Sequence, residues 1–321
     1  MKILKKLLTI VLLIVIILTT MFAISKPKYA KENVWLKENN NNQVLVMAHA
    51  GGKGVYPSNT RRAFDYSYNL GVDVLEMDVQ MTSDKVLVLR YGENETGNIS
   101  KMSNCDTVVW DETYDYLYNT CNFGYNFEDQ DGNFPYRNMT NLEWINADVY
   151  ITTLEELFIA YGDNILYTIE IKADADSWRT ETADELYKLI DKYSLFDNVL
   201  VATSYSDISE YIVATYPNIV LSASHDEAQT MIISSYTITS VFYQPTSYAA
   251  LQIPVSTNLP VINELNLATW LLVESAHSHN MAVHYWTIND EDEMRRLIKI
   301  GCDGIITDYP ESLIDLLNED N

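Results

Sequence analysis

Two pairs of charged residues occur at a spacing that could do chemistry. Glu76 and Asp78 lie two positions apart in one apolar run, and Glu170 and Lys172 lie two positions apart in another. Residues at positions i and i+2 of a β-strand point to the same face, so each pair is expected to share a face of a sheet. Carboxylate oxygens are the ligands that Ca²⁺ and Mg²⁺ prefer. The pattern indicates a divalent-cation site, whereas a single E-x-D on a strand is also common at a solvated sheet edge.

His49 follows the first apolar run after the N-terminal region and adds an imidazole to this set. The ordinary pKa of histidine lies near neutrality, so His49 could act as a general acid or base. A cation held by Glu76, Asp78 and Glu170 would reverse the local negative charge and let an anionic ester approach the imidazole. We therefore predict that these four side chains surround one cavity.

Charge and cysteine content narrow the classes of partner. The chain has 321 residues and a formal net charge of −24 at pH 7. Such a surface repels the phosphates of nucleic acids, so no nucleic-acid partner is expected, and no feature of the sequence predicts a protein partner. Cys105 and Cys121 could form a disulfide in an oxidising exterior, or they could remain thiols together with Cys302.

The elements that position these residues follow a repeating order. From residue 44 to residue 318, short apolar runs alternate with helix-like segments. This alternation predicts an α/β fold, a TIM (β/α)8-type barrel whose strands end at one mouth. A doubly wound open sheet is the alternative, but no glycine-rich dinucleotide loop follows the first strand. Strands are expected at 44–48, 72–79, 86–89, 165–171, 199–203, 219–223, 240–243, 282–287 and 304–307, and helices at 59–69, 154–161, 183–193, 208–216, 267–279 and 291–300.

The predicted barrel is irregular at its second and third strands, because only Gln80–Lys85 separates them. A parallel crossover needs about a dozen residues or more, so this part is expected to be hairpin-like. An insertion at about 93–149 follows, rich in Asn, Asp and Tyr.

The N-terminus carries a hydrophobic helix signal. Lys2, Lys5 and Lys6 flank the start of an uncharged run, Leu7–Ile24, so residues 1–25 are predicted to be a signal peptide or a membrane anchor. The lysines would keep the N-terminus in the cytoplasm, which predicts a single-pass cell-membrane protein with an extracellular C-terminal domain, or a secreted one after cleavage. Residues 26–43 are predicted to be a polar linker without a core of its own.

Longer motifs make a resemblance specific. They are AHAGG (48–52), SNT (58–60), GVDVLEMDVQMTSDKVLVL (71–89), TTLEEL (152–157), IEIK (169–172), HYWTIND (284–290) and GCDGIITDYPE (301–311). In this order they resemble the glycerophosphodiester phosphodiesterase family, within the superfamily of phosphatidylinositol-specific phospholipase C-like phosphodiesterases. The likeness covers essentially the whole chain after the linker.

The resemblance implies a reaction and a set of site residues. The reaction is hydrolysis of a glycerophosphodiester, a small phosphodiester of lipid metabolism, to sn-glycerol 3-phosphate and an alcohol. Glu76, Asp78 and Glu170 match the family's metal ligands, with Ca²⁺ or Mg²⁺ as the expected cofactor, and His49 matches its first catalytic histidine.

Three further residues are assigned to substrate binding. Lys172 matches a phosphate-contacting lysine, and Trp286 matches an aromatic residue that lines the pocket. His284 lies two positions before Trp286, so it is expected to point the same way and to contribute to the pocket.

The sequence departs from the family pattern at a catalytic position. Arg90 stands where the family has its second catalytic histidine, and Ala50 and Ser58 replace an arginine and a glutamate of the family motifs. Arginine stays protonated and cannot shuttle protons, so Arg90 is expected to stabilise a charged transition state and, together with Lys172, to contact the phosphate. Three interpretations stay open: a phosphodiesterase, a weakened or inactive member that binds a phosphodiester or polyol phosphate, and a phospholipase-type enzyme that makes a cyclic phosphate.

Overall fold

A closed barrel of eight parallel strands forms the centre of the protein. The computed structural model describes residues 5–6, 9–17, 31–90, 97–172, 176–237, 247–258 and 264–319. Pairing of β1 with both β2 and β11 closes the sheet, which confirms the predicted TIM-type barrel over the open sheet. In order around the barrel, the strands are β1 (Leu45–Ala48), β2 (Val74–Met81), β4 (Leu166–Ile171), β5 (Val199–Ala202), β6 (Val220–Ser222), β7 (Tyr248–Ile253), β10 (Ala282–Tyr285) and β11 (Gly304–Thr307).

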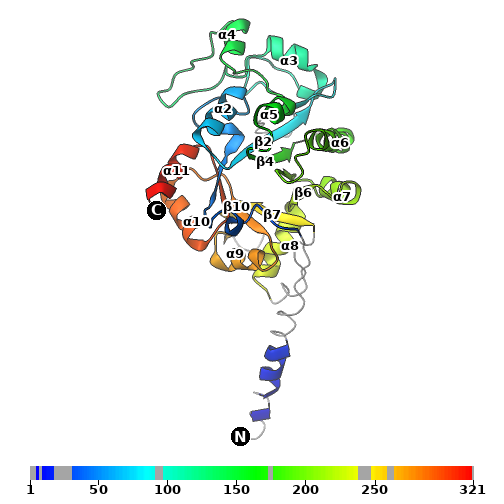
Figure 1. Cartoon of the computed structure of the whole chain (residues 1–321), viewed down its shortest axis with the longest axis vertical. Helices are drawn as coiled ribbons and strands as arrows, with labels where there is room; N and C mark the ends of the chain where they lie inside the picture. The colour runs from blue at the N-terminus through cyan, green and yellow to red at the C-terminus, as the bar shows by residue number, and fades with distance from the viewer. Residues whose placement is uncertain are drawn as a thin grey trace.

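Helices cover the outside of the barrel (Figure 1). They bury the apolar outer face of the strands, so a strand such as β2 is buried along its whole length. On β2 the outward residues Leu75, Met77 and Val79 join the main hydrophobic core. The helices are α2 (Arg61–Leu70), α5 (Leu154–Tyr161), α6 (Asp176–Tyr193), α7 (Ser206–Thr215), α8 (His225–Ser235), α9 (Trp270–His277), α10 (Glu291–Ile300) and α11 (Pro310–Glu319).

The predicted irregularity at the second and third strands is confirmed. β3 (Leu87–Leu89) pairs antiparallel with the end of β2 and lies outside the eight-stranded ring. The insertion follows it and contains the short helices α3 (Tyr114–Thr120) and α4 (Asn141–Asn146), which lie on one side of the barrel (Figure 1). A Cys105–Cys121 disulfide crosslinks this insertion, and Cys302 is a buried thiol. Of the two alternatives for Cys105 and Cys121, a disulfide or free thiols, the structure therefore contains the disulfide.

The N-terminal segment before the barrel is not the coreless linker that we predicted. Trp35 and Leu36 are buried, and the Asn33 side-chain amide donates to the carbonyl oxygens of Ala249 and Asn280 at 2.7 and 2.8 Å. These contacts attach the segment from residue 31 onward to the base of the barrel. The sequence did not predict this packing because only two large apolar side chains, those of Trp35 and Leu36, interrupt a polar stretch. Residues 26–30 lie outside the described residues.

Two other expectations fall partly outside the described residues. The strand expected at 240–243 lies outside the described residues. The sixth barrel strand in chain order is β7, which the sequence analysis did not predict. Residues 5–6 and 9–17 are helical, whereas residues 1–4, 7–8 and 18–25 of the predicted anchor are not described. No helix within the described ranges combines the length and the apolar character needed to cross a bilayer.

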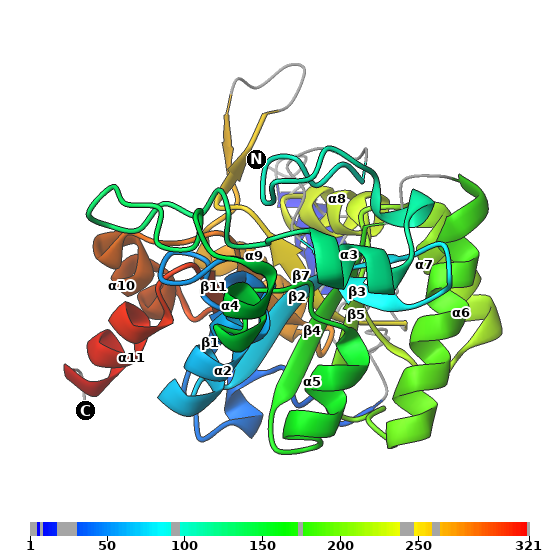
Figure 2. The same ribbon diagram turned by 90° about the horizontal axis from the view of Figure 1, so that it is seen from above.

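A two-stranded hairpin, β8 (Ser256–Thr257) and β9 (Leu265–Asn266), extends from the chain between β7 and α9. Figure 2 shows it (gold) projecting from the body of the barrel. Its base contributes to the cavity described below.

A buried carboxylate ties the base of the barrel together. Asp303 is fully buried and accepts hydrogen bonds from the backbone N–H of Lys37 at 3.0 Å and of Val283 at 2.8 Å. Its Oδ2 also lies 2.8 Å from Nε2 of His277. Burial lowers the pKa of His277, but the hydrogen bond and the charge of Asp303 outweigh this and raise the pKa above its ordinary value.

The raised pKa of His277 makes part of the stability depend on pH. A group whose pKa is higher in the folded state stabilises the fold below its unfolded pKa, and this contribution is lost as pH rises through the folded pKa. We expect His277→Ala to lower the free energy of unfolding more at about pH 5 than at about pH 9. Urea unfolding at the two pH values measures the difference. His225→Ala, which removes an exposed histidine, is the control. An equal loss at both pH values would contradict the prediction.

Candidate active site

The three predicted carboxylates meet at the mouth of the barrel. Glu76 and Asp78 project from the inner face of β2, and Asp78 lies directly opposite Glu170 on the neighbouring strand β4. One oxygen of each carboxylate lies within 4.8 Å of the others. Parallel strands in a closed barrel bring their C-terminal ends to one mouth, which is why residues almost a hundred positions apart converge.

The carboxylate cluster has the properties of a cation site. Burial is the main reason that the pKa of Glu76 rises to about 7; the positive charge of His49 lowers it, and the negative charge of Asp78 raises it further. Burial likewise raises the pKa of Asp78, and its Oδ2 is buried without a hydrogen-bond partner in the described part of the chain. Negative oxygens that are buried and incompletely paired fit a divalent cation with oxygen ligands.

Lys172 pairs with the carboxylate cluster. Its Nζ lies 2.7 Å from Glu170 Oε1 and 3.5 Å from Asp78 Oδ1. Burial lowers the pKa of Lys172, but the charges of Asp78 and Glu170 outweigh this and raise it. The lysine is therefore protonated and lines the same cavity as the carboxylates.

His49 lies on the other side of Glu76. It begins a tight turn in which Ala50 has a left-handed backbone, and the Ala50 N–H donates to Glu76 Oε2 at 2.9 Å. The Nδ1 atom of His49 lies 2.6 Å from Asp308 Oδ1, and its Nε2 lies 4.0 Å from Glu76 Oε2. An imidazole held at Nδ1 by a carboxylate presents Nε2 for proton transfer, as in the aspartate–histidine pairs of hydrolases.

Asp308 is a site residue that the sequence analysis did not single out. It follows β11, and the Asn289 side chain donates to its Oδ2 at 2.8 Å while Lys53 Nζ lies 3.8 Å from its Oδ1. Burial raises the pKa of Asp308, but the hydrogen bond and charge of His49 outweigh this and lower it. Asp308 is part of the TDYPE motif, but nothing in the sequence indicated that it contacts His49, which lies 259 positions earlier.

Arg90 does not lie where we expected it. The residue is buried directly after β3, its backbone N–H donates to the carbonyl of Asp78 at 2.9 Å, and its Nη2 donates to the carbonyl of Asn98 at 3.2 Å. It is not among the residues that line the cavity. The structure thus corrects the expectation that Arg90 contacts the phosphate; the guanidinium reaches the inserted segment, and its charge lowers the pKa of Asp78 from nearby.

Trp286 and His284 occupy different depths of the barrel. Trp286 follows β10, is 44% exposed and lines the cavity, as predicted. His284 is fully buried, with its Nε2 3.3 Å from the carbonyl oxygen of Trp35, and burial lowers its pKa. The expectation that His284 contributes to the substrate pocket is therefore corrected. The two side chains share a face, but two strand residues span about 7 Å and separate the mouth from the packed interior.

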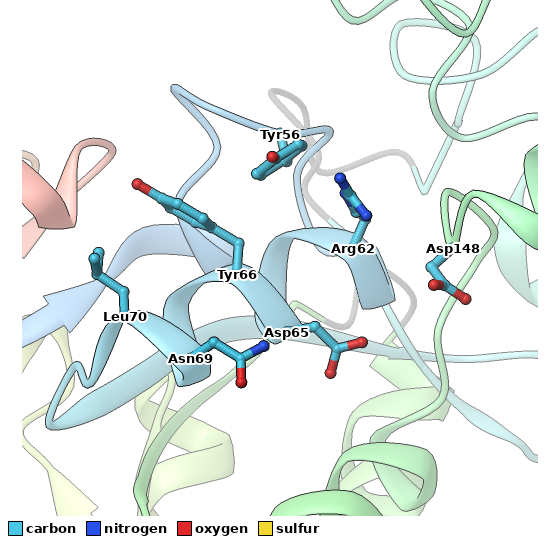
Figure 3. Close-up of a pocket in the computed structure, with 7 residues that line it drawn as sticks. All are labelled: Tyr56, Arg62, Asp65, Tyr66, Asn69, Leu70 and Asp148. Carbon is cyan, nitrogen blue, oxygen red and sulfur yellow. The ribbon is translucent and has the colours of Figure 1, made fainter.

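One cavity of about 770 Å³ contains the cluster, His49, Lys172 and Trp286. Hydroxyl groups that the sequence analysis missed line it next to the carboxylates, and Ser204 donates to Glu170 Oε1 at 3.2 Å. A second hollow of about 390 Å³ lies outside the barrel, beside α2 (Figure 3). There Arg62 stacks over Tyr56, and none of the predicted site residues is present. The candidate site is the first cavity.

A parallel barrel with an acidic cluster and a histidine–aspartate pair at its mouth has the parts of a metal-assisted hydrolase. Residues 49–312 match the model of the Glycerophosphoryl diester phosphodiesterase family, and the chain belongs to this family. Phosphoric diester hydrolysis is the activity that this membership supports.

Similar proteins align with this chain over nearly their whole length. A Glycerophosphodiester phosphodiesterase from Bacillus altitudinis is 26% identical over 85% of this chain and 98% of its own. The glycerophosphoryl diester phosphodiesterase domain of a Mycobacterium tuberculosis protein superposes with a TM-score of 0.68 at 18% identity, covering 86% of this chain and 99% of that one. A phosphodiesterase from Oleispira antarctica, solved with the product sn-glycerol-3-phosphate, gives 0.63 at 17% identity over 87% and 98%. These structures share the fold.

The Asp308–His49 contact leads to a testable prediction. Asp308→Asn keeps the shape of the side chain but removes the charge that orients and stabilises the protonated imidazole. We expect kcat for a phosphodiester to fall by about 10²- to 10⁴-fold, with KM changed less than about twofold. Steady-state kinetics measure both constants. Asp315→Asn, on the exposed side of α11, is the matched control. A variant that keeps the wild-type kcat would contradict a role for Asp308.

Proposed function

We propose that the protein is a metal-dependent phosphodiesterase that hydrolyses glycerophosphodiesters to sn-glycerol 3-phosphate and an alcohol. The observation that carries the proposal is the convergence of the Glu76, Asp78 and Glu170 carboxylates with His49 in one cavity. Membership of the family and the Oleispira antarctica structure with its product support the same reaction.

Each group has a chemical role in this proposal. Glu76, Asp78 and Glu170 would hold Ca²⁺ or Mg²⁺, which supplies positive charge to the phosphoryl oxygens when bound. The Asp308 carboxylate accepts a hydrogen bond from the Nδ1–H of His49, which turns Nε2 toward Glu76 and the cavity. From there His49 can take a proton from an attacking oxygen or give one to the leaving alcohol. Lys172 offers its ammonium group to the phosphate, and Trp286 lines the space for the organic part.

The alternative is a family member that binds a phosphodiester or polyol phosphate without efficient turnover. It is supported by the buried residue Arg90, which the motif resemblance aligns with the second catalytic histidine of the family. An arginine cannot exchange protons at physiological pH, so His49 would have to serve the attacking and leaving oxygens in turn.

The proposed location is the outer side of the cell membrane, either through an N-terminal anchor or after secretion. Lys2, Lys5 and Lys6 beside the apolar run favour this orientation. The Cys105–Cys121 disulfide also supports an oxidising compartment, because disulfides persist mainly outside the cytosol.

A metal-removal experiment tests the proposed reaction. Release of sn-glycerol 3-phosphate from glycerophosphocholine is measured with Ca²⁺, with Mg²⁺ and with a chelator. We expect release to require one of the two cations, and Asp78→Asn to lower kcat/KM by about 100-fold or more, because it removes a charged ligand. The exposed Asp315→Asn variant serves again as the control. Activity that is unchanged by the chelator would overturn the metal assignment.

Arg90→His separates the hydrolase from its binding alternative. Titration calorimetry measures glycerophosphocholine binding, and product release is measured in parallel. Wild-type turnover supports the hydrolase. Binding without turnover in the wild type, together with turnover in Arg90→His, would establish the alternative. Neither binding nor turnover in either protein would contradict both. Arg295→His, on the exposed part of α10, is the matched control.

A further inference from the structure

The hollow beside α2 has a lining of its own (Figure 3). Its volume of about 390 Å³ is that of a small ligand pocket. Among the described residues, none lines both this hollow and the cavity that holds His49 and Glu76. The lining comes from the loop before α2, from α2 itself and from the insertion: Tyr56, Arg62, Asp65, Tyr66, Asn69, Leu70 and Asp148.

The sequence of α2 places its contribution on one stripe of the helix. Positions 62, 65, 66, 69 and 70 follow the i, i+3, i+4 spacing of one face, whereas Ala63, Phe64 and Ser67 are buried on the other face. The Ser67 hydroxyl donates to the carbonyl oxygen of Gly51 at 2.8 Å, which attaches the buried face to the turn after β1. The lining stripe therefore has a rigid support.

Two tyrosine rings form part of the wall. The ring centroids of Tyr56 and Tyr66 lie 5.2 Å apart, in an edge-to-face arrangement at 64°. The guanidinium carbon of Arg62 lies 4.9 Å from the Tyr56 ring centroid, and the Tyr66 hydroxyl donates to Glu311 Oε2 at 3.3 Å. These contacts hold both rings in place in the absence of a ligand.

Polar groups with unused hydrogen-bonding capacity surround the rings. Asp65 Oδ1 accepts a hydrogen bond from Arg61 Nε at 2.9 Å, whereas its Oδ2 has no hydrogen-bond partner among the described residues. The side chains of Asn69 and Asp148 likewise make no hydrogen bond within the described ranges. The Asp148 backbone carbonyl accepts from the Arg62 N–H at 2.8 Å, which fixes residue 148 facing the start of α2 (Figure 3).

The charges around the hollow nearly cancel. Arg61 pairs with Asp65, and burial followed by the charge of Asp65 raises the pKa of Asp148, while Arg61 and Arg62 lower it. An anion would meet the carboxylates and a cation would meet the guanidinium groups, so the hollow has no strong electrostatic preference for either. A neutral ligand with several hydroxyls fits better, because a hydroxyl can donate to a carboxylate and accept from a guanidinium or amide N–H.

A sugar ring combines these properties. Its hydroxyls lie around the edge, and its C–H groups form a face that packs on the electron-rich face of an aromatic ring. Tyr56 and Tyr66 supply aromatic rings, and the planar side chains of Asp65, Asn69 and Asp148 can each contact neighbouring hydroxyls. Positions 62 and 69 are exposed, so a longer chain of sugars can continue from the hollow along the surface.

We infer that the hollow between α2 and Asp148 is a binding site for a neutral carbohydrate, which places a short stretch of a glycan against the two tyrosines. The site is independent of the proposed phosphodiesterase reaction, because its lining is separate from that of the barrel cavity. A glycan held there leaves the mouth of the barrel open to a small phosphodiester.

Titration followed by the NMR signals of the sugar tests the inference. The full-length protein is given three neutral trisaccharides in turn: maltotriose, cellotriose and N,N′,N″-triacetylchitotriose. We expect at least one of them to bind with a Kd on the order of 1 mM, as for a small site with few contacts. Asn69→Ala and Asp148→Asn should each raise this Kd by at least about threefold, because each weakens a hydrogen bond to a hydroxyl.

Both substitutions should leave the fold intact. Asn69 is exposed, and asparagine tolerates the left-handed backbone that Asp148 adopts at a φ of 59°. Asn318→Ala, at an exposed position of α11 outside the hollow, is the matched control and should leave the Kd unchanged.

Two results would overturn the inference. One is the absence of binding for all three trisaccharides at about 10 mM. The other is binding that neither Asn69→Ala nor Asp148→Asn weakens, which would place the sugar outside the hollow. A higher Kd in either variant, with an unchanged Kd in Asn318→Ala, supports the inference. Each of these results leaves the hydrolase proposal to its own experiments.

Discussion

Three negative charges held close together inside the mouth of a barrel govern the structure of this site. Glu76, Asp78 and Glu170 lie in or beside a low-dielectric interior, where burial first and then neighbouring carboxylates raise the pKa of Glu76 and of Asp78. The barrel imposes this proximity, since inward residues of adjacent parallel strands have no other direction to take. Two side chains that can carry positive charge lie beside the carboxylates: Lys172 contacts Glu170, and His49 lies near Glu76.

The same constraint explains why the site is built in layers. Asp308 compensates the charge that His49 gains beside Glu76, and Asn289 and Lys53 in turn contact Asp308. Charges of alternating sign thus extend from Glu76 through His49 and Asp308 to Lys53, in the loops that follow β1 and β11.

Local spacing predicted much of the fold and the core of the site. The i, i+2 pairs placed Glu76 with Asp78 and Glu170 with Lys172, and the bounds of α5 and α10 agree with those expected. β7 was missed because its sequence, YAALQI, contains alanine, leucine and glutamine, which favour helices in isolation; the barrel supplies the neighbours that make it a strand.

Three-dimensional relationships account for the remaining differences. The alternation of side chains along a strand predicted which face of the strand His284 occupies, but not how deep in the barrel it lies. Gly304 on the neighbouring strand leaves room for the imidazole ring, because a Cβ at position 304 would lie 2.9 Å from His284 Cδ2. The contact of His49 with Asp308 arises only when the last strand closes on the first. Trp35 and Leu36 likewise gain their packing from strands that come later in the chain.

The position of Lys172 has a consequence for the order in which ligands bind. Its ammonium lies 2.7 Å from Glu170 Oε1 and 3.5 Å from Asp78 Oδ1, so a divalent ion held by these carboxylates would replace it as their positive partner. The ammonium would then be available to an incoming anion. Occupancy by the cation and by the phosphate should therefore be thermodynamically coupled, each strengthening the affinity for the other by the same factor. In that case the lysine would serve as an internal counter-ion that exchanges one negatively charged partner for another.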